Sequence, residues 1–452
     1  MQQKITRDGF ASKFGVLVAA AGSAVGLGNL WRFPYMVGEN GGSAFLLIYL
    51  FFMIVLCLPV LIAEFVIGRR AQRDVIDAFN VLAPRSAWKG IGIAGLCAAL
   101  VILGFYCVVG GWTLAYIGKS IFSLPTTLPG DYYAGTFTSL ITSPVQPLVW
   151  CALFIALNAF VVSSGVKNGI ERYSKILMPI LFVMIVVLAI RAITLDSDMK
   201  GLRFLFQPDF SKVTGATFLA ALGQAFFSLS IGMGAMITYG SYIPKDSHLV
   251  KTSIGVMSTD MLFSLLAGLA VIPAVFAFGI SPAQGPGLVF VIFPEIFSKM
   301  PMGYVLEILF FTLLAIAALT SSISLFEVLV AWLVDAKKLS RRVAMACVTV
   351  VVGVLSILAS LSLGMLPNIS LFGKNLFNFF DSFSSNILLP LGGLFICLFV
   401  GWRMKPADVR DELTNSGNIR LPLFGCFRFI LRYITPIAIA VIFASGMGWL
   451  QI

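Results

Sequence analysis

The chain has 452 residues, of which 59% are hydrophobic and only 11% are charged. A soluble domain carries about 25% charged residues, so this composition excludes an ordinary soluble protein and indicates a polytopic membrane protein. The net charge is +11, but the basic residues are scattered through short loops instead of gathering on one face. This distribution excludes a nucleic-acid-binding surface, and no nucleic-acid partner is expected.

Apolar segments bounded by charged residues, proline or glycine predict eleven membrane-spanning helices. In chain order these spans cover residues 14–37, 43–68, 90–118, 147–166, 169–193, 214–243, 250–280, 303–334, 342–364, 374–402 and 428–450. An odd number of spans places the two termini on opposite sides of the membrane. The distribution of the 31 Lys and Arg residues predicts a cytoplasmic N-terminus and an extracellular or periplasmic C-terminus.

Two spans have glycine-rich interruptions in corresponding places of the two halves, Gly26-Leu27-Gly28 in the first and Gly232-Met233-Gly234 in the sixth. Such interruptions are typical of inverted-repeat transporters, whose binding site lies between the repeats. The predicted fold is an all-α polytopic membrane protein with eleven transmembrane helices, a 5+5 inverted repeat and broken helices 1 and 6. Its segments are a cytoplasmic N-terminal segment (1–13), a first repeat (14–193), an extracellular connection (194–213), a second repeat (214–402), a cytoplasmic loop (403–427) and an eleventh helix (428–452).

The interruption of the first span combines glycines with the polar residue Asn29, and Arg32 follows about one turn later. Lipid offers no hydrogen bonds to open backbone, so a broken helix persists only where it is buried in protein or lines a cavity. The break frees carbonyls that suit a small cation and N–H groups that suit a carboxylate. The carbonyls are those of Gly22, Ala24 and Val25, and the N–H groups are those of Leu27 and Gly28. A glycine-rich helix-packing face is the alternative interpretation.

Several ionisable residues fall within apolar segments, namely Arg32, Glu64, Asp260, Glu327 and Asp381. A charge at the centre of a span costs about 2.5–3.5 kcal/mol, so each of them needs a partner or a pathway. Asp260 can complete an oxygen cage for Na⁺ together with Asn29 and Ser228, since hard cations prefer oxygen ligands. A structural, hydrogen-bonded carboxyl group is the alternative.

Thr320-Ser321-Ser322 is a cluster of hydroxyl groups in the otherwise apolar eighth span. Hydroxyl groups in helices often bond back to the preceding turn, and this purely structural interpretation stays open. Free carbonyls in the first span favour a second sodium site here. No nucleophile–base pair, metal triad or cofactor motif is visible, so no enzymatic function is expected.

Longer motifs extend these features and carry a family resemblance. They are GSAVGLGNLWRFPY (22–35), ENGG (39–42), GQAFF (223–227), ITYGSY (237–242) and LTSS (319–322). With them the chain resembles the neurotransmitter:sodium symporters over nearly its whole length, and specifically their bacterial amino-acid branch. The resemblance implies a multi-pass protein of the bacterial inner (plasma) membrane, in contact with membrane lipid, which binds a small-molecule amino acid and is a monomer or weak dimer.

The resemblance implies two sodium sites as the bound cofactors. The first uses the carbonyl of Ala24, the side chains of Asn29, Ser228 and Asp260, and the carboxylate of the substrate. The second uses the carbonyls of Gly22, Val25 and Ala317 and the hydroxyls of Thr320 and Ser321.

The resemblance also implies how an amino acid is held. Its carboxylate meets the N–H groups of Leu27 and Gly28 and the hydroxyl of Tyr106. Its ammonium group meets carbonyls near Ala24, Phe227 and Ser228 and the hydroxyl of Ser230. Its side chain is surrounded by Ile102, Tyr106, Phe227, Met233, Ser321, Ser322 and Leu325.

Two gates follow from the same resemblance. The outer gate pairs Arg32 with Asp381 and places Phe227 over the substrate. The inner gate pairs Arg7 with Asp335 and is supported by Ser241, Tyr242 and Phe10.

Local differences within the family refine the substrate. Monoamine carriers of the family have an aspartate where Gly26 stands here, so Gly26 argues for an amino acid. Chloride-dependent members bind Cl⁻ near positions matching Tyr49, Gln224, Ser228 and Ser264. Asp260 replaces the neutral asparagine of those carriers, and its fixed charge predicts chloride independence.

Two further features concern the size of the substrate and the local unwinding of the fifth span. Met233 lies between two glycines, and a flexible thioether in a widened backbone favours an aromatic or large aliphatic substrate. Gly169 and Pro179 match a Gly-x9-Pro motif of some members, in which local unwinding gives water access to the second sodium site; an ordinary proline kink is the alternative.

The predicted function is sodium-coupled symport of a hydrophobic amino acid by alternating access. One alternative is a proton-coupled amino-acid transporter of the same fold, with Asp260 or Glu64 as the proton carrier. Another is a channel or a non-transporting amino-acid receptor built on the same scaffold.

Overall fold

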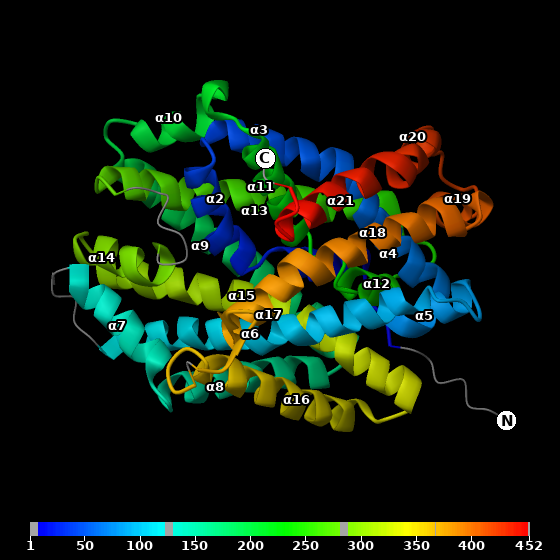
Figure 1. Ribbon diagram of the computed structural model, residues 1–452, viewed down its shortest axis with the longest axis horizontal. Coiled ribbons are helices and arrows are strands. Elements are labelled where there is room, and N and C mark those ends of the chain that lie inside the picture. The colour runs from blue at the N-terminus through cyan, green and yellow to red at the C-terminus, as the bar shows by residue number, and fades with distance from the viewer. Residues whose placement is uncertain (1–7, 123–129, 281–287, 367, 451–452) are drawn as a thin grey trace.

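The computed structural model describes residues 8–122, 130–280, 288–366 and 368–450. Apart from helices, these residues form one antiparallel hairpin, in which β1 (Ser370–Leu371) pairs with β2 (Lys374–Asn375). Figure 1 shows most helices running alongside one another along the long axis of the molecule. The predicted all-α architecture is confirmed.

Nine helical segments of the described residues are long and apolar enough to cross a membrane. Five are single helices: α6 (Lys89–Phe122), α8 (Gln146–Ser163), α13 (Leu249–Ala277), α15 (Gly303–Lys337) and α16 (Arg341–Leu361). The other four segments also contain widened turns: Ser43–Ala71 with α3 (Ser43–Phe52) and α4 (Leu58–Ala71), Val166–Leu195 with α9 (Arg172–Leu195), Leu376–Arg403 with α17 (Leu376–Phe383) and α18 (Leu389–Leu398), and Phe424–Gly446 with α20 (Phe424–Phe429) and α21 (Thr435–Gly446).

Two further spans are broken, as the glycines predict. α1 (Lys13–Ala24) meets the segment Gly28–Glu39, which contains α2 (Phe33–Glu39), at an angle of 50°. The sixth predicted span consists of α11 (Gly215–Ser228) and α12 (Ala235–Gly240), with a non-helical stretch between them. Each of the eleven predicted spans thus contains helix within the described residues, although α11 and α12 are each too short to count as a membrane-crossing helix.

Short helices cover the two ends of the molecule (Figure 1). α7 (Gly130–Thr142), α10 (Lys200–Phe206) and α14 (Phe293–Ser298) lie at one end. α5 (Val75–Leu82) and α19 (Pro406–Thr414) lie at the other end. At the first end, the ring of Phe290 stacks on Phe137 of α7 at 5.2 Å, which joins two of the covering segments.

Five helical turns have the wider i→i+5 hydrogen-bond pattern, and each of them ends two residues before a proline. They are Gly28–Arg32 before Pro34, Met53–Cys57 before Pro59, Leu288–Ile292 before Pro294, Ser384–Leu388 before Pro390 and Ile430–Ile434 before Pro436. Proline lacks an N–H group and its ring collides with the carbonyl four residues earlier, so the preceding turn opens by one residue. Proline positions thus fix where these helices deform.

Glycine allows the second span and the second half of the sixth to touch backbone to backbone. A Cβ atom at Gly68 of α4 would lie 2.0 Å from the carbonyl oxygen of Ile237 in α12. A Cβ atom at Gly240 of α12 would lie 3.0 Å from the Cα atom of Phe65. Any side chain at Gly68 must therefore move one of the two helices.

We expect Gly68→Ala to lower the free energy of unfolding by about 1–3 kcal/mol, because overpacking here meets backbone instead of a flexible side chain. Thermal denaturation of the purified protein in detergent measures the change. Gly353→Ala in α16 is the matched control, since no heavy atom lies within 4 Å of its added Cβ. Equal stability of the two variants would contradict the close contact of α4 and α12.

Candidate functional site

Side chains bind the N–H groups that the break of the first span exposes. Asn29 Oδ1 accepts a hydrogen bond from Gly26 N at 3.0 Å, and the hydroxyl of Tyr106 in α6 accepts one from Leu27 N at 3.2 Å. Among the described residues, no donor reaches the carbonyl oxygens of Gly22, Ala24 and Val25. The break therefore offers free carbonyl oxygens on one side and held N–H groups on the other.

The break of the sixth span depends on glycine and on a buried carboxyl group. Ser230, Gly232 and Gly234 all have positive φ angles, of 55°, 85° and 76°. The N–H of Gly232 donates to Glu64 Oε1 of α4 at 2.8 Å, and Glu64 is fully buried. Glu64, which sequence reasoning singled out as needing a partner, thus supports the open backbone of another span.

Serine hydroxyl groups connect the two breaks with the eighth span. Ser230 Oγ and Ser321 Oγ both donate to the carbonyl of Ser23, at 2.9 and 3.1 Å. Ser23 Oγ in turn donates to Ser324 Oγ of α15 at 2.7 Å. The residues at the two breaks and the hydroxyl cluster of α15 therefore meet at one point in the core.

The three residues predicted to cage Na⁺ are in direct contact. Ser228 Oγ lies 2.9 and 2.7 Å from the two carboxylate oxygens of Asp260, and Asn29 Nδ2 donates to Asp260 Oδ1 at 2.7 Å. Tyr49 donates to Asp260 Oδ2 at 3.3 Å, and Asn29 Nδ2 also reaches Ser264 Oγ at 2.8 Å. All five side chains are buried. The carboxylate of Asp260 thus lies among the hydroxyl groups that sequence reasoning associated with Cl⁻.

The hydroxyl cluster of α15 bonds back to its own helix and also lies against the break of the first span, so it fits both interpretations that the sequence left open. Thr320 Oγ1 donates back to the carbonyls of Ile316 and Ala317, each at 3.1 Å, as in an ordinary helix. A Cβ atom at Gly22 would lie 3.4 Å from Thr320 Cβ, so the cluster also packs against the break of the first span. A hydroxyl that donates its hydrogen keeps lone pairs for a cation.

A narrow space lies beside Gly26. A Cβ atom there would lie 2.9 Å from the hydroxyl of Tyr106 and 3.1 Å from Ser321 Oγ. A Cβ atom at Gly28 would lie 2.8 Å from the ring of Phe227. The absence of side chains at both glycines keeps room between the first, third, sixth and eighth spans.

The remaining residues predicted around a substrate side chain are buried. Ile102, Met233 and Leu325 are between 2% and 5% exposed. Ser322 points elsewhere, because its hydroxyl donates to Asn158 Oδ1 of α8 at 2.7 Å. Asn158 is fully buried, and sequence reasoning missed it; a lone amide in an otherwise apolar span was the available signal.

A cavity of about 330 Å³ extends from the side predicted to face outward to the break of the first span. It contains Leu27, Gly28 and Tyr106 together with both residues of the predicted outer gate. The guanidinium of Arg32 lies 5.0 Å from the centre of the Phe227 ring, and no ion pair joins Arg32 to Asp381 within the described residues. The predicted gate residues therefore face one cavity without closing it.

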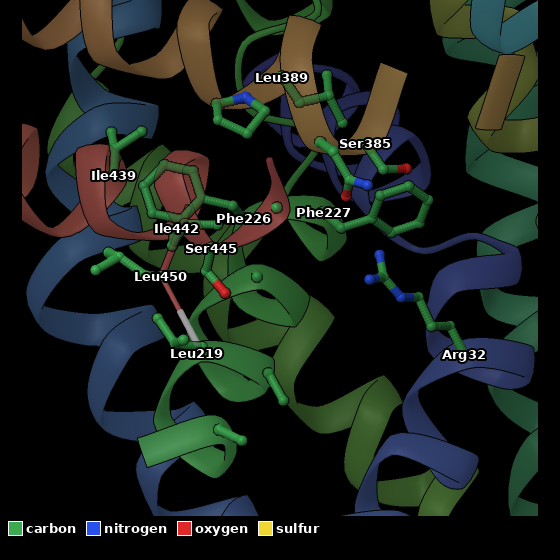
Figure 2. A pocket seen from close by; sticks show the side chains of 16 residues that line it. Arg32, Leu219, Phe226, Phe227, Ser385, Leu389, Ile439, Ile442, Ser445 and Leu450 are labelled. Atoms are coloured by element: carbon green, nitrogen blue, oxygen red, sulfur yellow. The ribbon is translucent and has the colours of Figure 1, made fainter. Parts of the chain in front are cut away.

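A second cavity of about 390 Å³ adjoins the first on the far side of Phe227. Figure 2 shows its apolar wall, to which Leu219 of α11, Leu389 of α18 and Ile439 of α21 contribute, and Arg32 at its edge. Arg32, Phe227, Ser385 and Asn386 line both cavities.

The opposite end is packed. The ring of Phe10 contacts Tyr239 and Tyr242 of the sixth span at 5.6 and 6.2 Å. The hydroxyl of Tyr242 donates to Glu327 Oε1 at 2.7 Å, and the guanidinium of Arg341 pairs with the same carboxylate. Glu327 thereby has the partner that its place in an apolar span requires.

The predicted inner gate lies only partly within the described residues. Asp335 Oδ2 accepts a hydrogen bond from Asp74 N at 3.1 Å, whereas Arg7 lies outside the described residues. Asp74 begins α5 and lies between spans, and burial raises the pKa of its carboxyl group to about 6.

Glu171 fixes the start of the first span to the fifth, and sequence reasoning missed it. Its carboxylate accepts hydrogen bonds from Ala11 N at 2.6 Å and from Ser12 Oγ at 2.8 Å, and it pairs with Lys175. Glu171 ends a widened turn, Val166–Glu171, that contains Gly169. Pro179 of the predicted motif lies inside the continuous helix α9.

We expect Asn158 and Ser322 to be energetically coupled, because their hydrogen bond is buried between α8 and α15. A double-mutant cycle with Asn158→Ala and Ser322→Ala should give a coupling of about 0.6 kcal/mol, with an upper bound near 1.7. Thermal or denaturant unfolding of the four proteins measures it. Strict additivity of the two substitutions would show that the contact adds no stability.

Known proteins resemble the chain over nearly its whole length. The sequence profile of the sodium:neurotransmitter symporter family matches residues 7–139 and 137–451. The chain is 41% identical over 442 residues to the uncharacterized sodium-dependent transporter YhdH of Bacillus subtilis (strain 168), covering 98% of each. It is 36% identical over 452 residues to an uncharacterized sodium-dependent transporter of Haemophilus influenzae, also covering 98% of each.

A solved structure has the same arrangement of helices. The crystal structure of MhsT in complex with L-phenylalanine matches with a TM-score of 0.89 and 45% identity, covering 97% of this chain and 100% of that chain. The sequence matches and the shared fold agree with the broken spans and the buried polar cluster described above. The chain belongs to the sodium:neurotransmitter symporter family and is a multi-pass, sodium-dependent symporter.

Proposed function

We propose that this protein uses Na⁺ to import a hydrophobic amino acid, aromatic or large aliphatic, by alternating access. The observation that carries the proposal is the contact of Asn29 with Ser228 and Asp260, next to the free carbonyls of the first span. Oxygen ligands from three spans meet there, which suits a hard cation. Na⁺ and substrate enter through the outer cavity while the packed inner end is closed. The outer end then closes and the inner end opens.

Two sodium sites belong to the proposal. The first comprises the Ala24 carbonyl, Asn29, Ser228, Asp260 and the substrate carboxylate, and the second comprises the carbonyls of Gly22, Val25 and Ala317 with Thr320 and Ser321. Each charge that crosses 100 mV gains about 2.3 kcal/mol, so two ions contribute about 4.6 kcal/mol from voltage alone.

The space beside Gly26 supports an amino acid as the substrate. A carboxylate placed there lies close to the N–H groups of Leu27 and Gly28 and to the hydroxyl of Tyr106, which already approaches Leu27 N at 3.2 Å. Helix N-termini favour such anions. The carbonyls of the break and Ser230 then bind the ammonium group.

A large apolar side chain fits the composition of the surroundings. Ile102, Phe227, Met233 and Leu325 supply apolar surface, and the positive φ angles on both sides of Met233 widen the backbone there. The crystal structure of MhsT, which is 45% identical to this chain, contains MhsT in complex with L-phenylalanine. Both facts favour an aromatic or large aliphatic substrate over a small one.

The orientation and assembly are also proposals. The end that carries α5 and α19 lies in the cytoplasm of a bacterial cell, and the end with α7, α10 and α14 faces outward. The relatives in Bacillus subtilis and Haemophilus influenzae support the bacterial inner membrane. A monomer or weak dimer, with the repeats at 14–193 and 214–402, completes the proposal.

Purified protein in proteoliposomes should accumulate labelled phenylalanine when an inward Na⁺ gradient is applied at constant pH. Asp260→Ala should reduce this accumulation by at least about tenfold, because removal of one member of a buried polar cluster costs more than about 1.4 kcal/mol. Gly353→Ala, far from any neighbour, serves as the matched control and should transport normally.

Accumulation driven by a proton gradient without Na⁺ would favour the proton-coupled alternative. Binding of phenylalanine without accumulation against a gradient would favour a receptor. If alanine or glycine competes better than every large amino acid, the proposed substrate class is wrong while sodium coupling stands.

The protein should transport independently of chloride, because Asp260 supplies a negative charge among Tyr49, Ser228 and Ser264. Replacement of chloride by gluconate should leave uptake unchanged. Asp260→Asn removes the charge but keeps the oxygen, so uptake by this variant should fall and should recover in part when chloride is added. Loss of uptake by the unmodified protein in gluconate is the contradictory outcome.

A further inference from the structure

The loop that joins the tenth and eleventh spans has all its acidic residues in ion pairs with other segments. Asp408 and Asp411 of α19 pair with Arg70 at 2.7 and 3.2 Å. Glu412 pairs with Arg69 and with Lys245, each at 2.8 Å. These carboxylates bind the loop to α4 and to the connection after α12, and they neutralise basic residues outside the loop.

The basic residues of the same loop and of the start of the eleventh span have no acidic partner among the described residues. Within the described part of the chain, no ion pair involves Arg403, Lys405, Arg410, Arg420, Arg428 or Arg432. The loop thus carries an excess of positive charge next to the ends of two membrane spans.

One of these arginines is held between exposed aromatic rings. The guanidinium carbon of Arg432 lies 4.1 Å from the ring centre of Trp402 and 5.6 Å from that of Tyr433. Trp402 Nε1 donates to the carbonyl of Arg432 at 3.1 Å, and a Cβ at Gly401 would lie 2.9 Å from Arg432 Cγ. Arg432 Nε is buried and has no hydrogen-bond partner. The arginine is therefore positioned by a close crossing of two spans.

The surroundings face the membrane. Only 22% of the apolar window of the eleventh span is buried, and Trp402, Phe429 and Tyr433 are 52%, 55% and 42% exposed. Trp and Tyr concentrate at the level of the lipid headgroups. Figure 1 places α20 at the end of the molecule that also carries α5 and α19. The unpaired charge and the aromatic rings thus coincide at one membrane surface.

We propose that Arg403, Arg428 and Arg432, with Trp402 and Tyr433, form a binding site for the headgroup of an anionic phospholipid. Arg428 and Arg432 are one turn apart and share a helix face. Planar guanidinium groups bind phosphate oxygens in pairs, and the exposed rings pack against the glycerol and upper acyl chains. Basic clusters next to spans attract anionic lipid in the same way.

The test compares phosphatidylglycerol with phosphatidylcholine of the same acyl chains, titrated onto the purified protein in neutral detergent. The midpoint of thermal unfolding should rise at a phosphatidylglycerol concentration at least about tenfold lower than that needed with phosphatidylcholine. Arg403→Gln/Arg428→Gln/Arg432→Gln should abolish this preference. The matched control is Lys337→Gln/Lys338→Gln/Arg342→Gln, which removes the same charge from exposed residues that form no ion pair with any other described residue, and it should keep the preference.

The proposal is wrong if both triple variants keep the same preference for phosphatidylglycerol. It is also wrong if the unmodified protein shows no such preference. Equal loss in both would show a net-charge effect and also overturn it. If soluble glycerol 3-phosphate stabilises the protein at the same concentrations, the ligand of the site is a free phosphate compound and the lipid proposal is wrong. If the first triple variant does not fold, Trp402→Leu decides: native mass spectrometry should find less bound phosphatidylglycerol than on the unmodified protein, and equal retention refutes the proposal.

Discussion

The side chain of Asn29 connects the open backbone of the first span with two other spans. Its oxygen holds the N–H of Gly26, and its nitrogen binds Ser228 of the sixth span and Asp260 of the seventh. Lipid cannot supply these hydrogen bonds, so the meeting of three spans at this amide stabilises the break. The free carbonyls beside it, and with them the candidate sodium site, depend on the same contact.

The two ends of the molecule differ in how firmly they are held. At the end proposed to be cytoplasmic, Phe10, Tyr242, Glu327 and Glu171 form ring contacts, hydrogen bonds and ion pairs that cross between spans. At the end proposed to face outward, Arg32 contacts the face of Phe227 and forms no ion pair among the described residues. An end with few polar contacts between spans opens at a smaller cost than one with many, which agrees with the cavity that reaches Tyr106 from this end.

Much of the architecture was predictable because its signals are local. Glycines beside Asn29 and around Met233 predicted both breaks, and apolar length predicted the spans. Asp260 was recognisable as a buried charge that needs partners. The partners of Asn158 and Glu171 were not predictable, because a lone polar residue does not reveal which distant span it faces. Arg341 was missed for the same reason: it begins a span and resembles a solvated end, yet it pairs with Glu327.

The widened turns before prolines have a consequence for how a span changes shape. Each turn contains one residue more than an α-helical turn, so the side chains beyond it are rotated relative to those before it. A hydrogen bond can pass from one acceptor to the next within such a turn while every buried N–H group keeps a partner. In the first span such a turn lies directly after the break. That span can therefore bend in small steps, without exposing unpaired backbone to lipid at any of them.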